Sequence, residues 1–247
     1  MPFPDAGLVL IRGLYWADQS KAADAVPARE RWFSGIAGEA ASLGVNSYTI
    51  RDDRGRGMAN RFLQRSRGTA PAMNLVEIMA IDEQHLRDSL TTDRGCAQWR
   101  KFCRDGSGQW NMDKSFILMG RPRQLLKGKG RGQRLLWFGN GVDELSRSEF
   151  IEHYTTRHGP LVAGFAHAIG LRSYHQVPDE QQVLCDRLRE LGMGSGSPPA
   201  VFAQLKMDMP PMTLSAIRER RVANTAIKAD EKRHICFEKS MLLLTAS

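Results

Sequence analysis

The sequence predicts an α+β protein built from two copies of a βαββαβ unit, and an internal repeat is the main observation behind this prediction. Residues 31–48 align without gaps on residues 157–174 and share seven identities in eighteen positions, at an offset of 126. Residues 113–118 resemble residues 238–243 at an offset of 125. The chain of 247 residues therefore divides into two related halves, each of a size usual for one domain.

Apolar runs with the features of β-strands occur in the same order in each half. In the first half these runs are residues 8–11, the segment after Gly44, residues 75–81 and residues 115–119. In the second half they are residues 135–138, the segment after Gly170, residues 201–207 and residues 240–244. Helical stretches follow the first and the third run of each half.

This order of elements is that of the ferredoxin-like fold, in which helices cover one face of an antiparallel sheet. The other face of each sheet needs a partner. We therefore expect two tandem ferredoxin-like units packed sheet to sheet, as an intramolecular dimeric α/β barrel. We place the N-terminal unit at residues 1–124, a basic glycine-rich linker at 125–133 and the C-terminal unit at 134–247.

Long connections at residues 51–73 and 178–199 separate the second and third strands of each half. Connections of this length are unusual, and they are often lids or binding loops. The sequence leaves a lid and a plain surface excursion equally open. A short helix is expected within the second connection, at residues 183–191.

The clearest helix signal lies over residues 150–161, where apolar residues recur at spacings of three and four. Ser146 and Glu149 precede this run and match a capping box. Pro160 disfavours the α conformation of the residue before it, so we expect the helix to kink or restart there. His158 would then lie near a carbonyl-rich helix end, where the helix dipole favours the imidazolium and burial favours the neutral ring.

The formal charge of +8 is concentrated in two segments rather than spread over the chain. Residues 121–134 hold six cationic side chains and residues 54–67 hold five arginines, with no acidic residue in either segment. Neither segment alternates basic with aromatic residues, so we expect no nucleic-acid partner. No apolar run approaches the roughly 20 residues of a membrane helix, so we expect no membrane association.

The four cysteines are dispersed and form no CxxC pair, which is typical of a reducing compartment and argues against structural zinc. The N-terminal residues contain no basic segment followed by an apolar stretch, as a secretory signal would. We therefore expect a cytoplasmic protein. The histidines show no HExxH or HxH pattern, so we expect no metal site.

The segment 135–176 resembles the EthD family of dimeric α/β barrel proteins. The resemblance rests on Leu-Leu-Trp-Phe, Ser-Glu-Phe-Ile-Glu-His-Tyr, Arg-His-Gly-Pro-Leu and Gly-Leu-Arg-Ser-Tyr-His-Gln. It extends more weakly through residues 230–232 to the closing strand, and it reaches the first half only through the internal repeat. The resemblance implies a barrel of ferredoxin-like units with a pocket between each sheet and its helices, in most cases without a cofactor.

Relatives of this kind include polyketide dehydratases and cyclases, lactone isomerases and proteins of aromatic or ether degradation. The family histidine carries over onto His158. The chain departs from the family pattern because both units are fused and because Trp32 stands where a second histidine would fall. We therefore expect one competent pocket and one degenerate half, and the possibility of a homodimer stays open.

Three residues are candidates for catalysis. His158 can accept and return a proton near neutral pH, because an unperturbed imidazole titrates at about 6.5. Tyr154 lies one helical turn before it and shares its face. Tyr174 and His175 are neighbours on a strand, so only one of them can face a given pocket, and we favour His175 for catalysis.

The candidates for substrate binding are mostly aromatic. They are Trp137, Phe165, Tyr174, Phe202 and Arg157. Each has an alternative structural role, namely core packing for the rings and an ion pair for Arg157, which is repeated as Arg31.

The function that these features favour is a cofactor-independent lyase or isomerase with His158 as general acid and base. Its substrate would be a small aromatic, polyketide-like or lactone compound, and the reaction a dehydration, a cyclisation or a double-bond shift. Two alternatives stay open: a cofactor-free or haem-linked monooxygenase, and a non-catalytic ligand-binding or accessory protein.

Overall fold

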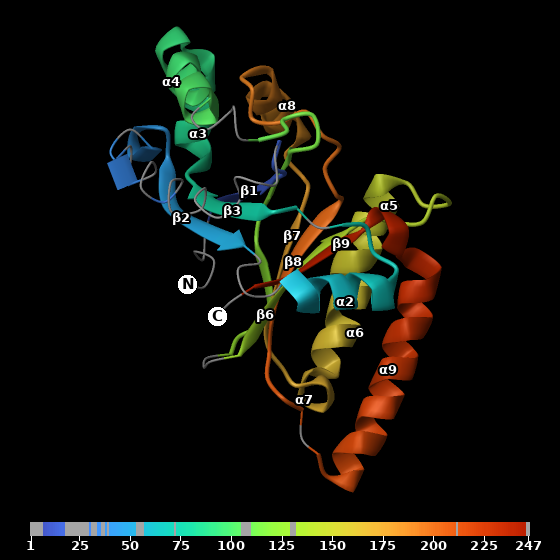
Figure 1. Ribbon diagram of the computed structural model, residues 1–247. Helices are drawn as coiled ribbons and strands as arrows, with labels where there is room; N and C mark the ends of the chain where they lie inside the picture. The colour runs from blue at the N-terminus through green and yellow to red at the C-terminus, as the bar shows by residue number, and fades with distance from the viewer. Residues whose placement is uncertain are drawn as a thin grey trace. The chain divides into compact units, whose positions relative to one another are not determined.

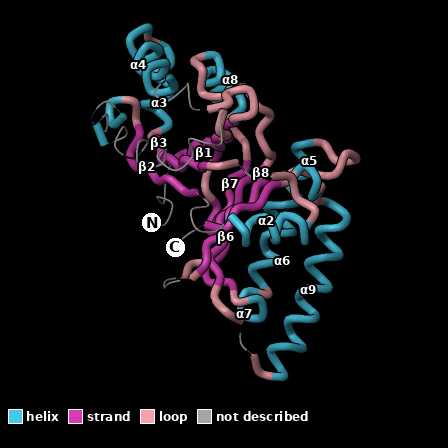
Figure 2. Tube along the Cα trace, in the orientation of Figure 1, coloured by secondary structure: helices cyan, strands magenta, loops and turns pink. Residues whose placement is uncertain are grey.

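The computed structural model describes residues 7–17, 30, 34–35, 38, 40–52, 57–71, 73–104, 110–128, 132–210 and 212–245 (Figures 1 and 2). The chain forms two compact units, and neither is a continuous segment. The first unit comprises Met1–Asp52, Met73–Pro122 and Glu180–Pro198. The second unit comprises Asp53–Ala72, Arg123–Asp179 and Pro199–Ser247.

The first unit contains a four-stranded antiparallel sheet in the order β2-β3-β1-β4. Its strands are β1 (Leu8–Leu14), β2 (Val45–Asp52), β3 (Leu75–Ile81) and β4 (Phe116–Gly120). Its helices include α3 (Glu83–Thr91), α4 (Asp93–Arg104) and α8 (Gln182–Glu190). The apolar faces of these helices pack on the sheet around Trp99, which is fully buried.

The second unit contains a sheet in the order β5-β7-β8-β6-β9. Its strands are β5 (Arg123–Leu126), β6 (Gln133–Gly139), β7 (Leu171–Pro178), β8 (Val201–Met207) and β9 (Met241–Thr245). Its helical elements are α2 (Gly57–Arg67), α5 (Arg147–His153), η3 (Tyr154–His158), α6 (Gly159–Gly164), α7 (Ala166–Ile169), α9 (Leu214–His234) and η4 (Phe237–Lys239). Figure 1 shows α6 and α9 running along the same side of this sheet.

Each sheet has the strand order of the ferredoxin-like fold, so the predicted βαββαβ architecture is confirmed. In the second unit β6, β7, β8 and β9 repeat the order of the first unit, and β5 adds a strand beside β7. The packing of the two sheets against each other stays a prediction.

Backbone geometry explains the glycine shared by the two copies of the repeat. Gly44 and Gly170 have φ angles of +82° and +73°, in the left-handed region that favours glycine. Each accepts a hydrogen bond at 2.8 Å from an equivalent backbone amide, that of Asp82 or Asp208. A register shift follows directly after each glycine, in β2 and in β7.

The serine that recurs just before the last strand of each half also has a structural role. Ser115 and Ser240 are fully buried just before the closing strand of each sheet. Their hydroxyls donate to the carbonyls of Asn111 and Cys236, at 2.8 and 2.7 Å. Each hydroxyl also accepts from a backbone amide at the end of the first strand, so the serine ties two strands together. The repeat therefore preserves turns and strand contacts.

The long connections contain regular structure. The first carries α2, which belongs to the second unit, and the second carries α8, which belongs to the first unit. Each insertion therefore packs on the unit built mainly from the other half of the sequence. The expected helix at 183–191 is confirmed as α8. The strand β5 includes the first two residues of the stretch expected to be a linker, and the boundaries at 124 and 134 stay a prediction.

The expected restart is present, because a π-turn ends at His158 and α6 begins at Gly159, but the chain does not leave the helical conformation there, so the expected carbonyl-rich helix end is wrong. The capping box at Ser146 and Glu149 is confirmed and starts α5. The backbone then stays helical through a π-turn into α6, and Gly159 has φ −58° and ψ −53°. Glycine has no Cβ to clash with the ring of Pro160, so the α conformation is accessible to it there. The amide of Gly159 bonds to the carbonyl of Tyr154, five residues earlier, and this widens the turn.

In the described part of the chain, no helix combines the length and apolarity that crossing a bilayer requires. Trp32 and Arg31, the first-half counterparts of His158 and Arg157, lie outside the described residues.

Candidate functional site

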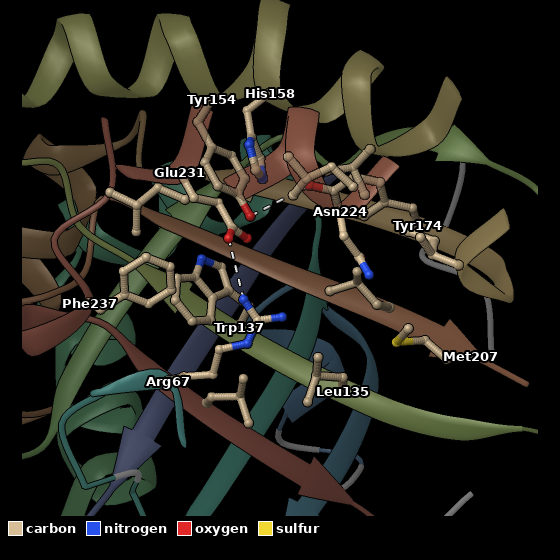
Figure 3. Close-up of a pocket in the computed structure, with 16 residues that line it drawn as sticks. Arg67, Leu135, Trp137, Tyr154, His158, Tyr174, Met207, Asn224, Glu231 and Phe237 are labelled. Atoms are coloured by element: carbon tan, nitrogen blue, oxygen red, sulfur yellow. Dashed lines mark hydrogen bonds and ion pairs between the residues drawn. The ribbon is translucent and has the colours of Figure 1, made fainter. Parts of the chain in front are cut away.

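A cavity of about 180 Å³ lies in the second unit, between the sheet and the helices that cover it (Figure 3). From the sheet it is lined by Leu135, Trp137, Tyr174, Leu205, Met207 and Leu242. From the helices and connections it is lined by Arg67, Tyr154, His158, Val162, Ile169, Asn224, Ile227, Glu231, Ile235 and Phe237. The wall is therefore mainly apolar, with a few polar groups that converge on one space.

His158 is held in a fixed orientation. It lies at the end of the π-turn, its side chain is 6% exposed, and Nδ1 is 2.8 Å from Oδ2 of Asp230 on α9. A carboxylate can only accept, so Nδ1–H is the donor, and the neutral ring then carries its lone pair on Nε2. Nε2 has no hydrogen-bond partner among the described residues. The π-turn and α9 together therefore fix the orientation of this imidazole at the cavity wall.

Asp230 is shared by three histidines. Its Oδ1 lies 2.9 Å from Nε2 of His153, and its backbone carbonyl accepts from Nδ1 of His234 at 2.9 Å. Burial alone would raise the pKa of Asp230, but hydrogen bonds and charge interactions with His158 and His153 outweigh it, so the pKa lies below its usual value. Burial, followed by the charge of His234, lowers the pKa of His153 although Asp230 opposes this. Asp230 is therefore a carboxylate at neutral pH.

Two buried tyrosines line the cavity, and one of them lies beside His158. The ring of Tyr154 lies 4.8 Å from the imidazole, and its hydroxyl is 3.5 Å from that of Tyr174. Burial raises the pKa of Tyr174 to about 12 and that of Tyr154 well above its usual value. Gln176 donates to the Tyr174 hydroxyl at 2.8 Å. In this series of hydrogen bonds, the Tyr174 hydroxyl accepts from Gln176 and donates to the Tyr154 hydroxyl. The O–H of Tyr154 is then left as a donor toward the cavity.

An ion pair stands at another part of the wall. Arg67, the last residue of α2, places Nη1 3.3 Å from Oε2 of Glu231. The side chain of Arg67 is 46% exposed and that of Glu231 is 15% exposed. Figure 3 shows Glu231 on the same side as Tyr154 and His158, and Arg67 on the opposite side with the indole of Trp137 beside it.

The structure brings together some of the predicted site residues. Trp137, Tyr154, His158 and Tyr174 all line the cavity. Tyr174 rather than His175 faces it, because successive residues of β7 point to opposite faces. His175 is buried away from the cavity lining, and burial lowers its pKa.

Three further predicted residues do not line the cavity. Phe202 is fully buried and packs on Phe138, with ring centroids 5.0 Å apart. Both lie on the opposite face of the sheet from Trp137, again because side chains alternate along a strand. Phe165 is half-buried at the junction of α6 and α7, and Arg157 is exposed.

Sequence reasoning missed Asp230, Glu231, Arg67 and Gln176. Gln176 could have been found, because it lies two residues after Tyr174 and so shares its strand face. Asp230 and His234 share a helix face at a spacing of four, but nothing local shows that this face meets His158. Arg67 lies in an insertion of the other half, and no local pattern connects it with this sheet.

His153, Asp230 and His234 are the described residues that could hold a metal ion, since their ligand atoms all lie within 4.8 Å of one another. The two imidazoles are stacked, with centroids 3.5 Å apart and an angle of 18° between their planes. Lone pairs that lie in nearly parallel planes do not converge on one ion. The rings would have to rotate to form the tetrahedral arrangement that zinc prefers.

These features define an α+β protein of two ferredoxin-like units, one of which has a mainly apolar cavity lined by a histidine that a carboxylate orients. Residues 143–235 match the EthD domain model. The matched residues include both His158 and Asp230. The predicted resemblance of the second half is confirmed. A search of the curated proteins finds no match.

Two solved structures are similar to the chain. One, from Fusobacterium nucleatum subsp. nucleatum, is of a protein whose designation as a monooxygenase is provisional. It has 10% sequence identity and a TM-score of 0.47, over 98% of this chain and 93% of that one. The other is a mutant chlorite dismutase from Candidatus Nitrospira defluvii, with 8% identity and a TM-score of 0.46, over 97% of this chain and 91% of that one.

Proposed function

We propose that the protein is a cofactor-independent lyase or isomerase acting on a small aromatic or lactone substrate, with His158 as the general acid and base. One observation carries this proposal: an imidazole oriented by a partly buried carboxylate lines a mainly apolar cavity and keeps its second nitrogen free of the carboxylate. An orienting carboxylate sets the tautomer of the imidazole and stabilises the imidazolium that forms during proton transfer.

The chemistry begins with removal of a proton from a carbon next to a carbonyl group. Nε2 of His158 takes the proton, and Asp230 stabilises the resulting imidazolium through Nδ1–H. The electron pair moves onto the carbonyl oxygen, and the hydroxyl of Tyr154 is a suitable donor to that developing oxyanion.

The imidazolium then returns its proton, and the position of return decides the outcome. Protonation of a leaving hydroxyl at the β carbon expels water and completes a dehydration. In a substrate that already has a double bond beside the α carbon, proton removal gives a dienolate, and protonation of its γ carbon completes a double-bond shift. The balance of atoms is kept in both cases without an oxidant or a reductant.

The size of the cavity favours a substrate with one ring. An engineered apolar cavity of roughly 150 Å³ in another protein binds benzene, so a cavity of about 180 Å³ suits a substituted ring of similar size. Drug-sized ligands occupy pockets of roughly 300–1,000 Å³. Among the substrates that the sequence suggests, a single-ring aromatic or lactone therefore fits better than a multi-ring polyketide.

Deuterium exchange tests the proposal without knowledge of the natural substrate. The protein is incubated in D2O with cyclohexanone or δ-valerolactone, and NMR follows deuterium entry beside the carbonyl. We expect exchange with the wild type, a loss of about 10²- to 10⁴-fold in His158→Gln, and a loss of at least about tenfold in Asp230→Asn. The matched control is His167→Gln, an exposed histidine on α7 that does not line the cavity.

Equal exchange by the wild type and His158→Gln would overturn the proposal. Oxygen consumption with electron-rich phenols, or a haem absorbance band in the purified protein, would favour the monooxygenase alternative instead. Tight binding of ring compounds with no exchange or turnover of any probe would favour a binding or accessory protein.

A further inference from the structure

The helix α2 is held against β9 by side chains that make hydrogen bonds to its backbone, as a neighbouring strand would. The amide of Asn60, which is buried, donates to the carbonyl of Leu244 at 3.0 Å and accepts from its backbone amide. Gln64 donates to the carbonyl of Leu242 at 3.1 Å. These bonds satisfy backbone groups on the edge of β9, and they hold α2 against this strand. Arg67 is the last residue of α2, so these bonds also help to position it at the cavity wall.

Arg67 differs in charge from the rest of the wall. Among the described residues that line the cavity, it alone carries a permanent positive charge. Its ion pair with Glu231 is a single contact at 3.3 Å, although a guanidinium can bind a carboxylate through two parallel hydrogen bonds. Because Arg67 is half exposed, the pair is weakly held, and exchanging one carboxylate for another costs little.

We propose that Arg67 binds a carboxylate group on the substrate, and that Glu231 occupies this position when the cavity is empty. This proposal rests on the proposed function, because it names the substrate class as a single ring that bears a carboxylate. Figure 3 shows Arg67 and His158 on opposite sides of the same cavity. A ring held by its carboxylate at Arg67 turns its far side toward Nε2 of His158, so Arg67 determines which carbon is presented to the base.

Binding of two nearly isosteric probes tests this inference. Benzoate carries the carboxylate and benzamide does not, and the fluorescence of Trp137 or calorimetry reports their binding. We expect the wild type to bind benzoate more tightly than benzamide. Arg67→Gln should weaken the binding of benzoate about 10- to 100-fold, because a hydrogen bond between charged groups is lost. The affinity for benzamide should stay unchanged. Arg65→Gln removes the same charge from an exposed position on the same helix, and it should change the affinity for neither probe.

Glu231 provides a prediction of opposite sign. Glu231→Gln removes the competing carboxylate, so benzoate should bind several-fold more tightly than to the wild type, whereas benzamide should be unaffected. Inorganic phosphate separates a shaped carboxylate site from a general anion site. We expect phosphate not to compete with benzoate at equal concentration, because the ring contributes much of the binding.

Several results would overturn the inference. These are equal affinity of the wild type for benzoate and benzamide, equal effects of Arg67→Gln and Arg65→Gln, and phosphate competing as well as benzoate. If Arg67→Gln does not fold, Arg67→Lys replaces it and should retain part of the benzoate affinity. Binding does not require turnover, so the expected pattern without deuterium exchange would support the inference and refute the proposed function.

Discussion

Two glycines of α6 provide a matched pair for testing how tightly the helix packs beside the site. A Cβ on Gly159 would lie 2.5 Å from Nε2 of Gln176 and 2.6 Å from Cδ1 of Leu125, closer than such atoms approach. A Cβ on Gly164, five residues later, would meet nothing within 4 Å. The same substitution therefore has opposite expected effects on the free energy of unfolding.

The magnitudes follow from these distances. Overpacking a filled interior costs about 1–3 kcal/mol, and Gly159→Ala adds the clash of a Cβ with the ring of Pro160. Gln176 would have to move, which weakens its bonds to the carbonyl of Tyr154 and the hydroxyl of Tyr174. We expect Gly159→Ala to lower the free energy of unfolding by about 1–3 kcal/mol. Gly164→Ala should raise it by about 0.4–1 kcal/mol, because alanine restricts the unfolded chain.

Urea denaturation followed by tryptophan fluorescence measures both effects as shifts of the midpoint. Benzoate binding to each folded variant shows whether the displaced Gln176 also disturbs the cavity, and we expect weaker binding only in Gly159→Ala. A midpoint for Gly159→Ala at or above that of the wild type would refute the packing described here. So would equal midpoint shifts in the two variants.

Two further predictions concern buried polar groups. Burial raises the pKa of Tyr174 from 10.0 to about 12, so its neutral form contributes stability that is present below pH 10 and is lost as the pH rises toward 12. Urea midpoints between pH 8 and 12 should therefore fall less steeply in Tyr174→Phe, and parallel curves would contradict this. In the first unit, Glu77 is fully buried, pairs with Arg12 at 3.4 Å and accepts from the hydroxyl of Tyr48. Glu77→Ala should lower the free energy of unfolding by about 3–5 kcal/mol, because it leaves a buried charge unpaired. Glu83→Ala breaks exposed ion pairs and should cost under about 1 kcal/mol per pair. Similar losses in the two variants would contradict the burial of Glu77.

The repeat was the most informative feature of the sequence because its identities mark backbone requirements. The left-handed glycines, Gly44 and Gly170, end one element and begin a strand in each half, and the paired serines close each sheet. Strand positions followed from apolar runs, and the run 201–207 coincides with β8. Such signals are local, which is why sequence alone predicted the fold of each unit and singled out His158.

Contacts between distant segments depended on the tertiary structure. Asp230 orients His158 from 72 residues away, and Arg67 reaches Glu231 across 164 residues, from an insertion in the other half. The sequence narrowed the choice on β7 to Tyr174 or His175, but which face of the strand meets the helices is set by packing. The sequence by itself therefore determined the repeated units and the candidate base. Only the tertiary structure showed which carboxylate, which tyrosine hydroxyls and which cation surround this histidine, because these contacts depend on how whole elements pack.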